Sequence, residues 1–198
     1  FCPMIIGEIR RYLRDNNTIR VSRSIRDTAY KALQVKERLM AETEKEPSVE
    51  AIAKEMGVSE ELLLKAVTLS NLVTIHQKAG IGRLSAYCGA ISAGCGAGAG
   101  IAYLHGGNAH AIAHTVVNAI AILSGTICDG AKPSCAAKIA SAVEAGILGY
   151  HMYLEGQQFY SGDGIVTKGV ENTIRNIGRL ARDGMTETDK QIIKIMLQ

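Results

Sequence analysis

Apolar side chains recur every three to four residues along most of the 198-residue chain, which is the spacing of one face of an α-helix. Residues 4–15 and 23–43 follow this pattern, and Asn16 and Asn17 break it between them. The same pattern, together with capping residues, predicts further helices at 49–56, 60–77, 86–104, 108–124, 135–154, 167–182 and 187–197. The stretch 86–107 lacks the alternation of β-branched residues typical of strands. We therefore expect an all-α fold.

Capping residues mark the helix boundaries in the first third of the chain. Ser48 is a good N-cap for the short helix 49–56, and Gly57 is suited to end it. Ser59 caps the next helix, whose first turn carries Glu60 and Glu61, where negative charge suits the helix dipole. A short helix, a glycine turn and a second helix have helix-turn-helix character. Taken alone, this pattern is more often a plain corner between helices than a DNA reader.

Charge is distributed unevenly, although the formal net charge is only +3. Residues 1–38 carry nine Lys and Arg against four Asp and Glu, whereas residues 39–66 carry three against seven. From residue 83 onward Gly and Ala dominate, and charged residues nearly vanish until Asp129. The excess of positive charge in residues 1–38 is thus typical of a phosphate-binding surface. The small residues from 83 onward permit close helix packing.

The string PMIIGEIRRYLRDNNTIRVSRSIRDTAYKALQV, followed by the helix-turn-helix-like segment, resembles region 3 of bacterial sigma factors, particularly the sporulation-type members. The resemblance covers residues 1–66. It implies a three-helix module whose first helix faces promoter DNA and which also meets RNA polymerase core. Glu8 and Arg11 match the family's positions and share a helix face, and Arg10 and Arg14 add a phosphate-facing edge. Arg23 continues this basic track, so all five are expected to contact DNA. Without the family match, a solvated Arg face on an amphipathic helix explains the same residues.

Four cysteines, Cys88, Cys95, Cys128 and Cys135, are the candidates for metal chemistry in the rest of the chain. In a reducing compartment they are expected to be thiols or metal ligands rather than disulfides. Thiolates are the usual ligands of iron-sulfur clusters, and no pair has the short spacing of a zinc site. The alternative is that each Cys is a small buried hydrophobe.

The segments TLSNLVTIHQKAGIGRLSAYCGAISAGCGAGAGIAYLHGGN, SGTICDGAKPSCAAK and VENTIRNIGRLARDGMTETDKQIIKIM resemble the serine dehydratase alpha-like family, which includes L-cysteine desulfidases. The resemblance covers residues 67–198. It implies a 4Fe-4S cluster held by three cysteines, with one iron open to a small amino-acid substrate. Cys88, Cys128 and Cys135 match the ligand positions, and Cys95 remains assigned to the core.

Loss of a β-substituent from an amino acid requires a Lewis acid on the leaving group and a base for the α-proton. By the resemblance, the open iron supplies the first. Lys132 is expected to pair with the substrate carboxylate, near a helix start whose backbone N–H groups favour a thiolate or a carboxylate. Asp129 is either a supporting partner or a turn residue beside Gly130. The general base is not identified, because the family draws part of its active site from a larger amino-terminal portion; a second chain is expected to supply it.

Two other patterns carry less weight. His110 and His114 are spaced like a helical metal pair, but no third ligand follows from the sequence, so we interpret them as structural. The run GCGAGAG at 94–100 does not fit the dinucleotide-binding pattern and follows no strand. Nucleotide binding is therefore excluded as an interpretation.

Together these observations predict two parts, 1–66 and 67–198, joined inside one helix. The preferred function is that of a fragment of an iron-sulfur lyase acting on L-serine or L-cysteine. The alternatives are a sigma-factor fragment that binds promoter DNA or RNA polymerase, and a chimera without function. The apolar runs are interrupted before they reach the roughly 20 residues of a membrane span, so we expect a cytoplasmic protein without a membrane partner.

Overall fold

A computed structural model describes residues 23–198, with side chains from residue 31 onward except residue 33. The predicted helix at 4–15 lies outside the described residues. The elements are α2 Arg23–Thr43, α3 Val49–Met56, α4 Glu60–Ile81, α5 Gly89–Leu104, α6 Ala109–Leu123, α7 Ser134–Leu154, α8 Val170–Arg179, the π-helix η1 Leu180–Gly184 and α9 Thr186–Met196. The described residues contain no strand, only one isolated antiparallel bridge between Tyr87 and Ile127. The all-α prediction is confirmed.

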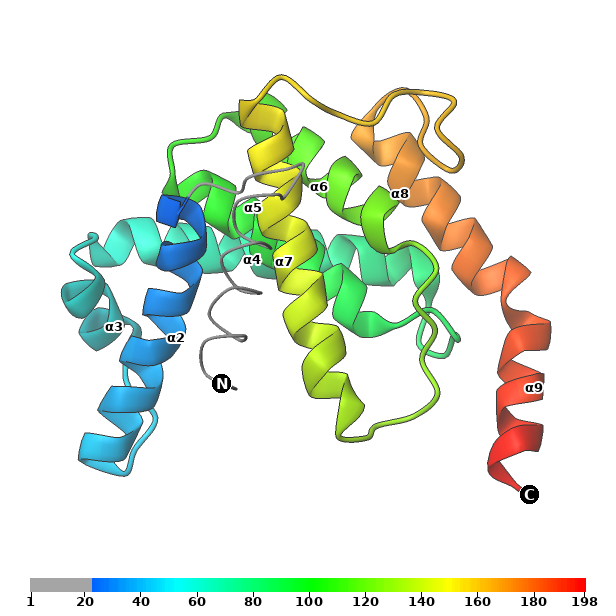
Figure 1. Ribbon diagram of the computed structural model, residues 1–198, viewed down its shortest axis with the longest axis horizontal. Coiled ribbons are helices and arrows are strands. Elements are labelled where there is room, and N and C mark those ends of the chain that lie inside the picture. The colour runs from blue at the N-terminus through cyan, green and yellow to red at the C-terminus, as the bar shows by residue number, and fades with distance from the viewer. Residues whose placement is uncertain (1–22) are drawn as a thin grey trace, which may run out of the picture.

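Helix α5 lies at the centre of the fold and packs against α4, α6 and α7 (Figure 1). Its glycines make this packing tight on two sides. A Cβ added to Gly98 would lie 2.7 Å from the Cα of Gly146 in α7, and one added to Gly100 would lie 2.9 Å from the carbonyl oxygen of Ala66 in α4. Real Cβ atoms do not approach other atoms this closely. The Gly-rich composition therefore serves backbone-to-backbone helix packing.

Helix α4 runs without a break through residue 66, where the sequence predicts the border between two parts. Ser59 caps it as expected, because its side-chain oxygen accepts a hydrogen bond of 3.2 Å from the backbone N–H of Leu62. Leu63 and Ala66, before the border, and Ile81, after it, are all buried. The two sides of the border thus share one helix, as the sequence predicts, and the helix extends beyond the predicted end at 77.

A buried amide ties α6 to α7 and to the loop that follows α7. Asn118 is fully buried in α6. Its Nδ2 donates a hydrogen bond of 3.0 Å to the carbonyl oxygen of Gly149, and its Oδ1 accepts one of 3.1 Å from the backbone N–H of Phe159. Both polar ends of this side chain are therefore satisfied, as burial of a polar group requires.

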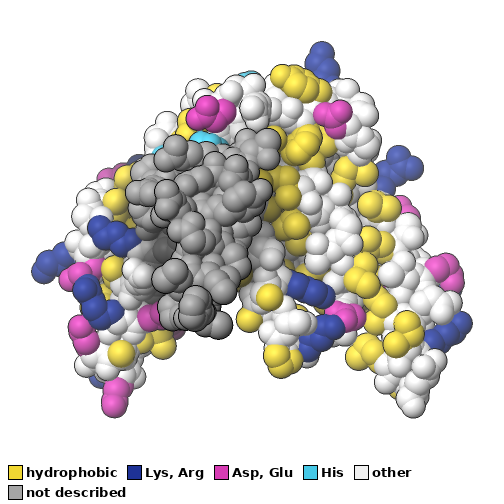
Figure 2. All heavy atoms as spheres, in the orientation of Figure 1, with side chains coloured by type: hydrophobic (Ala, Val, Ile, Leu, Met, Phe, Trp, Pro, Cys, Tyr) yellow, Lys and Arg dark blue, Asp and Glu magenta, His cyan; other side chains and the backbone are white. Residues whose placement is uncertain are grey.

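The chain ends in a helical segment that leaves the body of the fold. The predicted helix 167–182 is α8 followed by η1, and α9 then extends away from the other helices (Figure 1). No residue of α9 is buried, and its Ile193, Ile195 and Met196 are exposed, as is Leu197 just beyond it. Hydrophobic side chains dot the side of the surface that carries α8 and α9 (Figure 2). None of the described helices is both long and apolar enough for a membrane span.

Candidate metal centre

Two of the predicted cysteine ligands lie on backbone segments that pair with each other. The bridge between Tyr87 and Ile127 places Cys88 beside the segment that carries Cys128. The backbone N–H of Cys88 donates to the carbonyl oxygen of Thr126 at 3.1 Å, and that of Cys128 donates to Ala86 at 2.6 Å. Cys88 is also the N-cap residue of α5. Residues 40 positions apart are thus held side by side by two backbone hydrogen bonds.

The third predicted ligand follows on the next helix. Cys135 lies in the first turn of α7, and its Sγ is 3.6 Å from the carbonyl oxygen of Gly130 in the loop after Cys128. The backbone N–H groups of Cys135 and Ala136 donate to Lys132 and Pro133 within this turn. These two N–H groups are therefore bonded within the turn and are not among those available to an anion. The helix dipole still favours negative charge here.

Two lysines and one carboxylate fix the loop between these cysteines. Nζ of Lys138 donates to the carbonyl oxygen of Ile127 at 2.9 Å and to Oδ1 of Asp129 at 3.0 Å. Lys132 forms a second ion pair with Asp129. The hydrogen bond from Lys132, followed by that from Lys138, lowers the pKa of Asp129 to about 2. Asp129 is thus a charged partner of both lysines rather than only a turn residue.

Lys138 was missed by the sequence reasoning. The hydrogen bond to Asp129 raises the pKa of its ammonium, and the nearby sulfurs of Cys88 and Cys135 act in the same direction. The available signal was spacing, because residues three apart on a helix share a face and Lys138 follows Cys135 by three. The ammonium of Lys132, predicted to bind a substrate carboxylate, is held by Asp129 in this structure. That role stays a prediction.

The residues fit an iron-sulfur cluster by donor chemistry and by neighbourhood. Cys88, Cys128 and Cys135 carry free thiols on adjoining segments, and thiolates are the ligands such clusters use. Within residues 31–198, however, no three His, Cys, Asp or Glu side chains are gathered closely enough to hold a metal ion. A cluster bound by all three cysteines would require their sulfurs to be drawn closer together.

Cys95 lies on α5 in the same buried cluster as Cys88, whereas Cys128 and Cys135 are half-buried. It is 1% exposed in the core, and burial raises the pKa of its thiol to about 12. Nearby, burial also raises the pKa of Tyr87, whose hydroxyl has no hydrogen-bond partner among the described residues. A thiol with so high a pKa is neutral at pH 7, which agrees with the assignment of Cys95 to the core.

The histidine pair of α6 forms a ring cluster with a tyrosine of α7. The Nε2 atoms of His110 and His114 are 3.1 Å apart, and Nδ1 of His110 is 3.3 Å from the hydroxyl of Tyr153. The ring of His114 stacks on that of Tyr153. No third metal-ligating side chain of the described part joins them, and the contacts are those of a structural cluster.

The predicted DNA-contacting residues cannot be placed. Glu8, Arg10, Arg11 and Arg14 lie outside the described residues, and Arg23 begins α2 without a described side chain. The predicted helix-turn-helix-like segment is present as α3 and α4.

Comparison with known proteins identifies relatives for the part of the chain that carries the cysteines. A UPF0597 protein of Desulfitobacterium hafniense is 69% identical over 145 residues, which are 73% of this chain and 34% of the relative. UPF0597 proteins of Lachnoclostridium phytofermentans and Treponema denticola are 56% and 47% identical, again over about three quarters of this chain and 34% of each relative. No solved structure matches. The chain spans about a third of the length of these curated relatives.

The matching family model, described as serine dehydratase alpha chain, covers residues 47–194. It therefore begins ahead of the predicted border at residue 66 and takes in α3, all of α4 and every described cysteine. Neither this match nor the relatives named above point to a sigma factor. The chain belongs to the serine dehydratase alpha chain family.

Proposed function

We propose that this chain is the cysteine-bearing part of an iron-sulfur lyase that performs β-elimination on a small L-amino acid, L-serine or L-cysteine. The observation that carries the proposal is the placement of Cys88, Cys128 and Cys135 on adjoining segments, the paired loop segments and the start of α7. Family membership supports the reaction class.

The three thiols would hold the cluster as thiolates, and the cluster, when bound, would supply a Lewis-acidic iron for the leaving hydroxide or hydrosulfide. The chain's own contribution is to position these ligands. Lys138 holds the backbone and side chain on either side of Cys128 through Ile127 and Asp129, and a cation beside thiolates stabilises their negative charge. Lys132 would bind the substrate carboxylate once its ion pair with Asp129 opens.

The remaining parts of the active site, including the base for the α-proton, belong to residues beyond those described here. Two observations support a requirement for further protein. The relatives are about three times as long as the matched segment, and apolar side chains of α4 and α9 lie exposed, among them Leu72, Ile75 and Ile193. We propose that the rest of a family protein, in the same chain or a second one, covers such surfaces and completes the site.

Anaerobic reconstitution with iron and sulfide tests the cluster directly. Wild type is expected to develop the broad visible absorption of an iron-sulfur cluster, at roughly four irons per chain, and Cys128→Ser is expected to lose most of it. Cys95→Ala is the matched control, because it removes a cysteine of α5 that is assigned to the core. Absence of the band in wild type, or equal loss in Cys95→Ala, would contradict the proposed ligand set.

The promoter-binding alternative has no support among the described residues or the comparisons. It would be tested by salt-dependent binding to a duplex with an extended promoter element against a scrambled duplex. Equal binding to both duplexes would remove promoter recognition.

A further inference from the structure

Two histidines near the start of α6 face each other, at the end of that helix away from the cysteine-bearing loop. The Nε2 atoms of His110 and His114 are 3.1 Å apart, whereas the centroids of the two rings are 4.3 Å apart. Because the nitrogens are closer together than the ring centres, each ring directs its Nε2 toward the other. Residues four apart on a helix lie on one face, so α6 itself sets this arrangement.

Contacts with α7 hold both rings in place. Nδ1 of His110 is 3.3 Å from the hydroxyl of Tyr153, and the ring of His114 stacks on the ring of the same tyrosine. Nδ1 of His114 is buried without a hydrogen-bond partner among the described residues, so Nε2 is the nitrogen that a ligand can reach. A metal-binding histidine usually has a partner on its second ring nitrogen, which fixes the ring. Tyr153 has this position beside His110.

The distance between the two Nε2 atoms suits a metal ion. A bond between zinc and a histidine nitrogen is about 2.0–2.1 Å long, so two nitrogens bound at an angle of about 90–110° lie about 2.8–3.4 Å apart. The observed 3.1 Å falls within this range. An N–H···N hydrogen bond has a similar length, so an ion can replace the shared hydrogen with little movement of either ring.

The protonation and exposure of the pair also suit a metal ion. Burial and the neighbouring His110 lower the pKa of His114, and the neutral ring is the form that binds a metal. His110 is exposed and His114 is half-buried, which leaves room for water ligands where no third metal-ligating side chain of residues 31–198 is close enough. The positive end of the α6 dipole opposes a cation at the first turn and limits its affinity.

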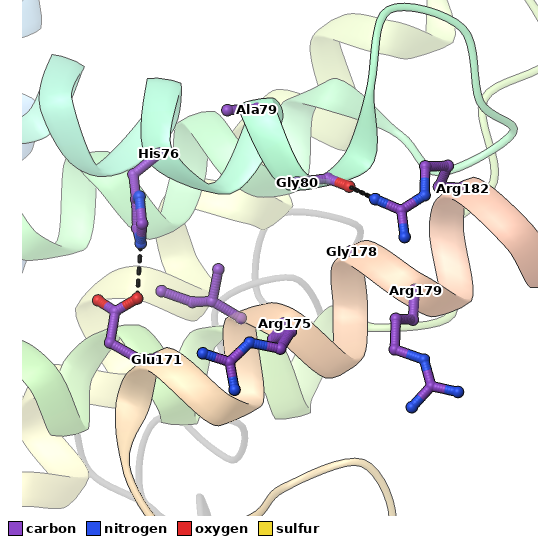
Figure 3. Close-up of a pocket in the computed structure, with 9 residues that line it drawn as sticks. His76, Ala79, Gly80, Glu171, Arg175, Gly178, Arg179 and Arg182 are labelled. Atoms are coloured by element: carbon purple, nitrogen blue, oxygen red, sulfur yellow. Dashed lines mark hydrogen bonds and ion pairs between the residues drawn. The ribbon is translucent and has the colours of Figure 1, made fainter.

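A histidine of α4 provides the contrast. His76 points across a cavity of about 280 Å³ toward α8 (Figure 3), and its Nε2 is 2.8 Å from Oε2 of Glu171. This nitrogen faces a carboxylate of another helix and not a second imidazole. His76 thus offers a control for the α6 pair.

We propose that His110 and His114 form a two-histidine site for a divalent transition-metal ion such as Zn²⁺, Ni²⁺ or Cu²⁺, for which imidazole is a suitable ligand. Both Nε2 atoms and water bind the ion, which links successive turns of α6 and stabilises the folded chain. The site shares no residue with the proposed iron-sulfur ligands. It therefore goes beyond the proposed function, and either proposal can fail without the other.

Isothermal titration calorimetry of the untagged 198-residue chain with Ni²⁺ tests the proposal. Wild type is expected to bind the ion and to show a higher Tm in its presence. His110→Ala and His114→Ala are each expected to weaken binding at least about tenfold, since even a lost supporting partner of a metal ligand costs about 10–100-fold. Cys128→Ser is expected to retain binding, which separates the histidine pair from the thiols.

His76→Ala is the matched control, because it removes an exposed histidine outside the pair. It is expected to leave Ni²⁺ binding unchanged, and circular dichroism shows whether each variant is folded. Absence of Ni²⁺ binding by wild type overturns the proposal, as does unchanged binding by folded His110→Ala. A loss in Cys128→Ser as large as that in His114→Ala also overturns it, because the ion would then belong to the thiols.

Discussion

The packing of α5 against α7 makes a sharp prediction for Gly98→Ala. In most helices this change is stabilising, since alanine is favoured over glycine by up to about 1 kcal/mol. At Gly98 the new Cβ would lie 2.7 Å from the Cα of Gly146 and 3.0 Å from its carbonyl carbon and oxygen. All three contacts are with backbone, so no side chain can rotate away. The helices themselves must separate.

The expected magnitude follows from these two opposing effects. Overpacking a core costs about 1–3 kcal/mol, and a backbone neighbour puts this site at the upper end. Subtracting the propensity gain of about 1 kcal/mol leaves a net loss of about 2 kcal/mol. For a chain of this length, that loss lowers Tm by about 4–8 °C.

Gly89→Ala is the matched control in the same helix. Gly89 is exposed in the first turn of α5, and an added Cβ meets nothing within 4 Å. It is expected to leave stability unchanged or raise it by up to about 1 kcal/mol. Urea unfolding followed by circular dichroism measures both variants. A Gly98→Ala protein as stable as wild type would refute the close approach of α5 and α7.

Three further outcomes are expected, one from a buried amide, one from the cysteines and one from a helix cap. Asn118→Ala removes two buried hydrogen bonds and should lower the free energy of unfolding by about 2–4 kcal/mol. Asn172→Ala, at an exposed position, should change it by less than about 0.5 kcal/mol. Urea unfolding measures both variants, and equal effects would contradict the buried hydrogen bonds of Asn118. At pH 8 the Cys95 thiol, with a pKa of about 12, should resist iodoacetamide, whereas half-buried Cys128 and Cys135 should react. Mass spectrometry of the labelled folded protein measures this, and rapid labelling of Cys95 would be inconsistent with its burial. Ser59→Ala should cost about 1 kcal/mol through loss of the N-cap bond of α4, and thermal unfolding with no change would show that this bond contributes nothing.

Much of the fold follows from local signals in the sequence. The caps Ser48 and Ser59 and the turn at Gly57 predict α3 and the start of α4, because they satisfy backbone groups within a few residues. The sequence pattern predicts an end of α4 at 77, whereas the helix ends at Ile81. The residues in between are held by contacts with α8, which are non-local and leave no periodic signal. The same reason explains why the π-helix η1 was not foreseen.

The candidate site was predictable in its cysteines and less so in their surroundings. Family resemblance marked Cys88, Cys128 and Cys135, but the bridge that brings the first two together joins residues 40 apart. Lys138 was missed because its importance lies in two hydrogen bonds to the loop before α7. The ligand set of three cysteines stays a prediction. The contacts around these cysteines depend on tertiary structure, which the sequence pattern does not show.

The border predicted at residue 66 has a physical meaning that differs from a junction between independent domains. A domain boundary is normally an exposed linker crossed by few contacts. Here Ala66 is 2% exposed, and its carbonyl oxygen lies against Gly100 of the central helix. A larger side chain at Ala66 would therefore disturb the packing of α5, the helix that begins beside Cys88. Helix α3 packs on α4, and α4 packs on α5, in agreement with a family match that starts at residue 47.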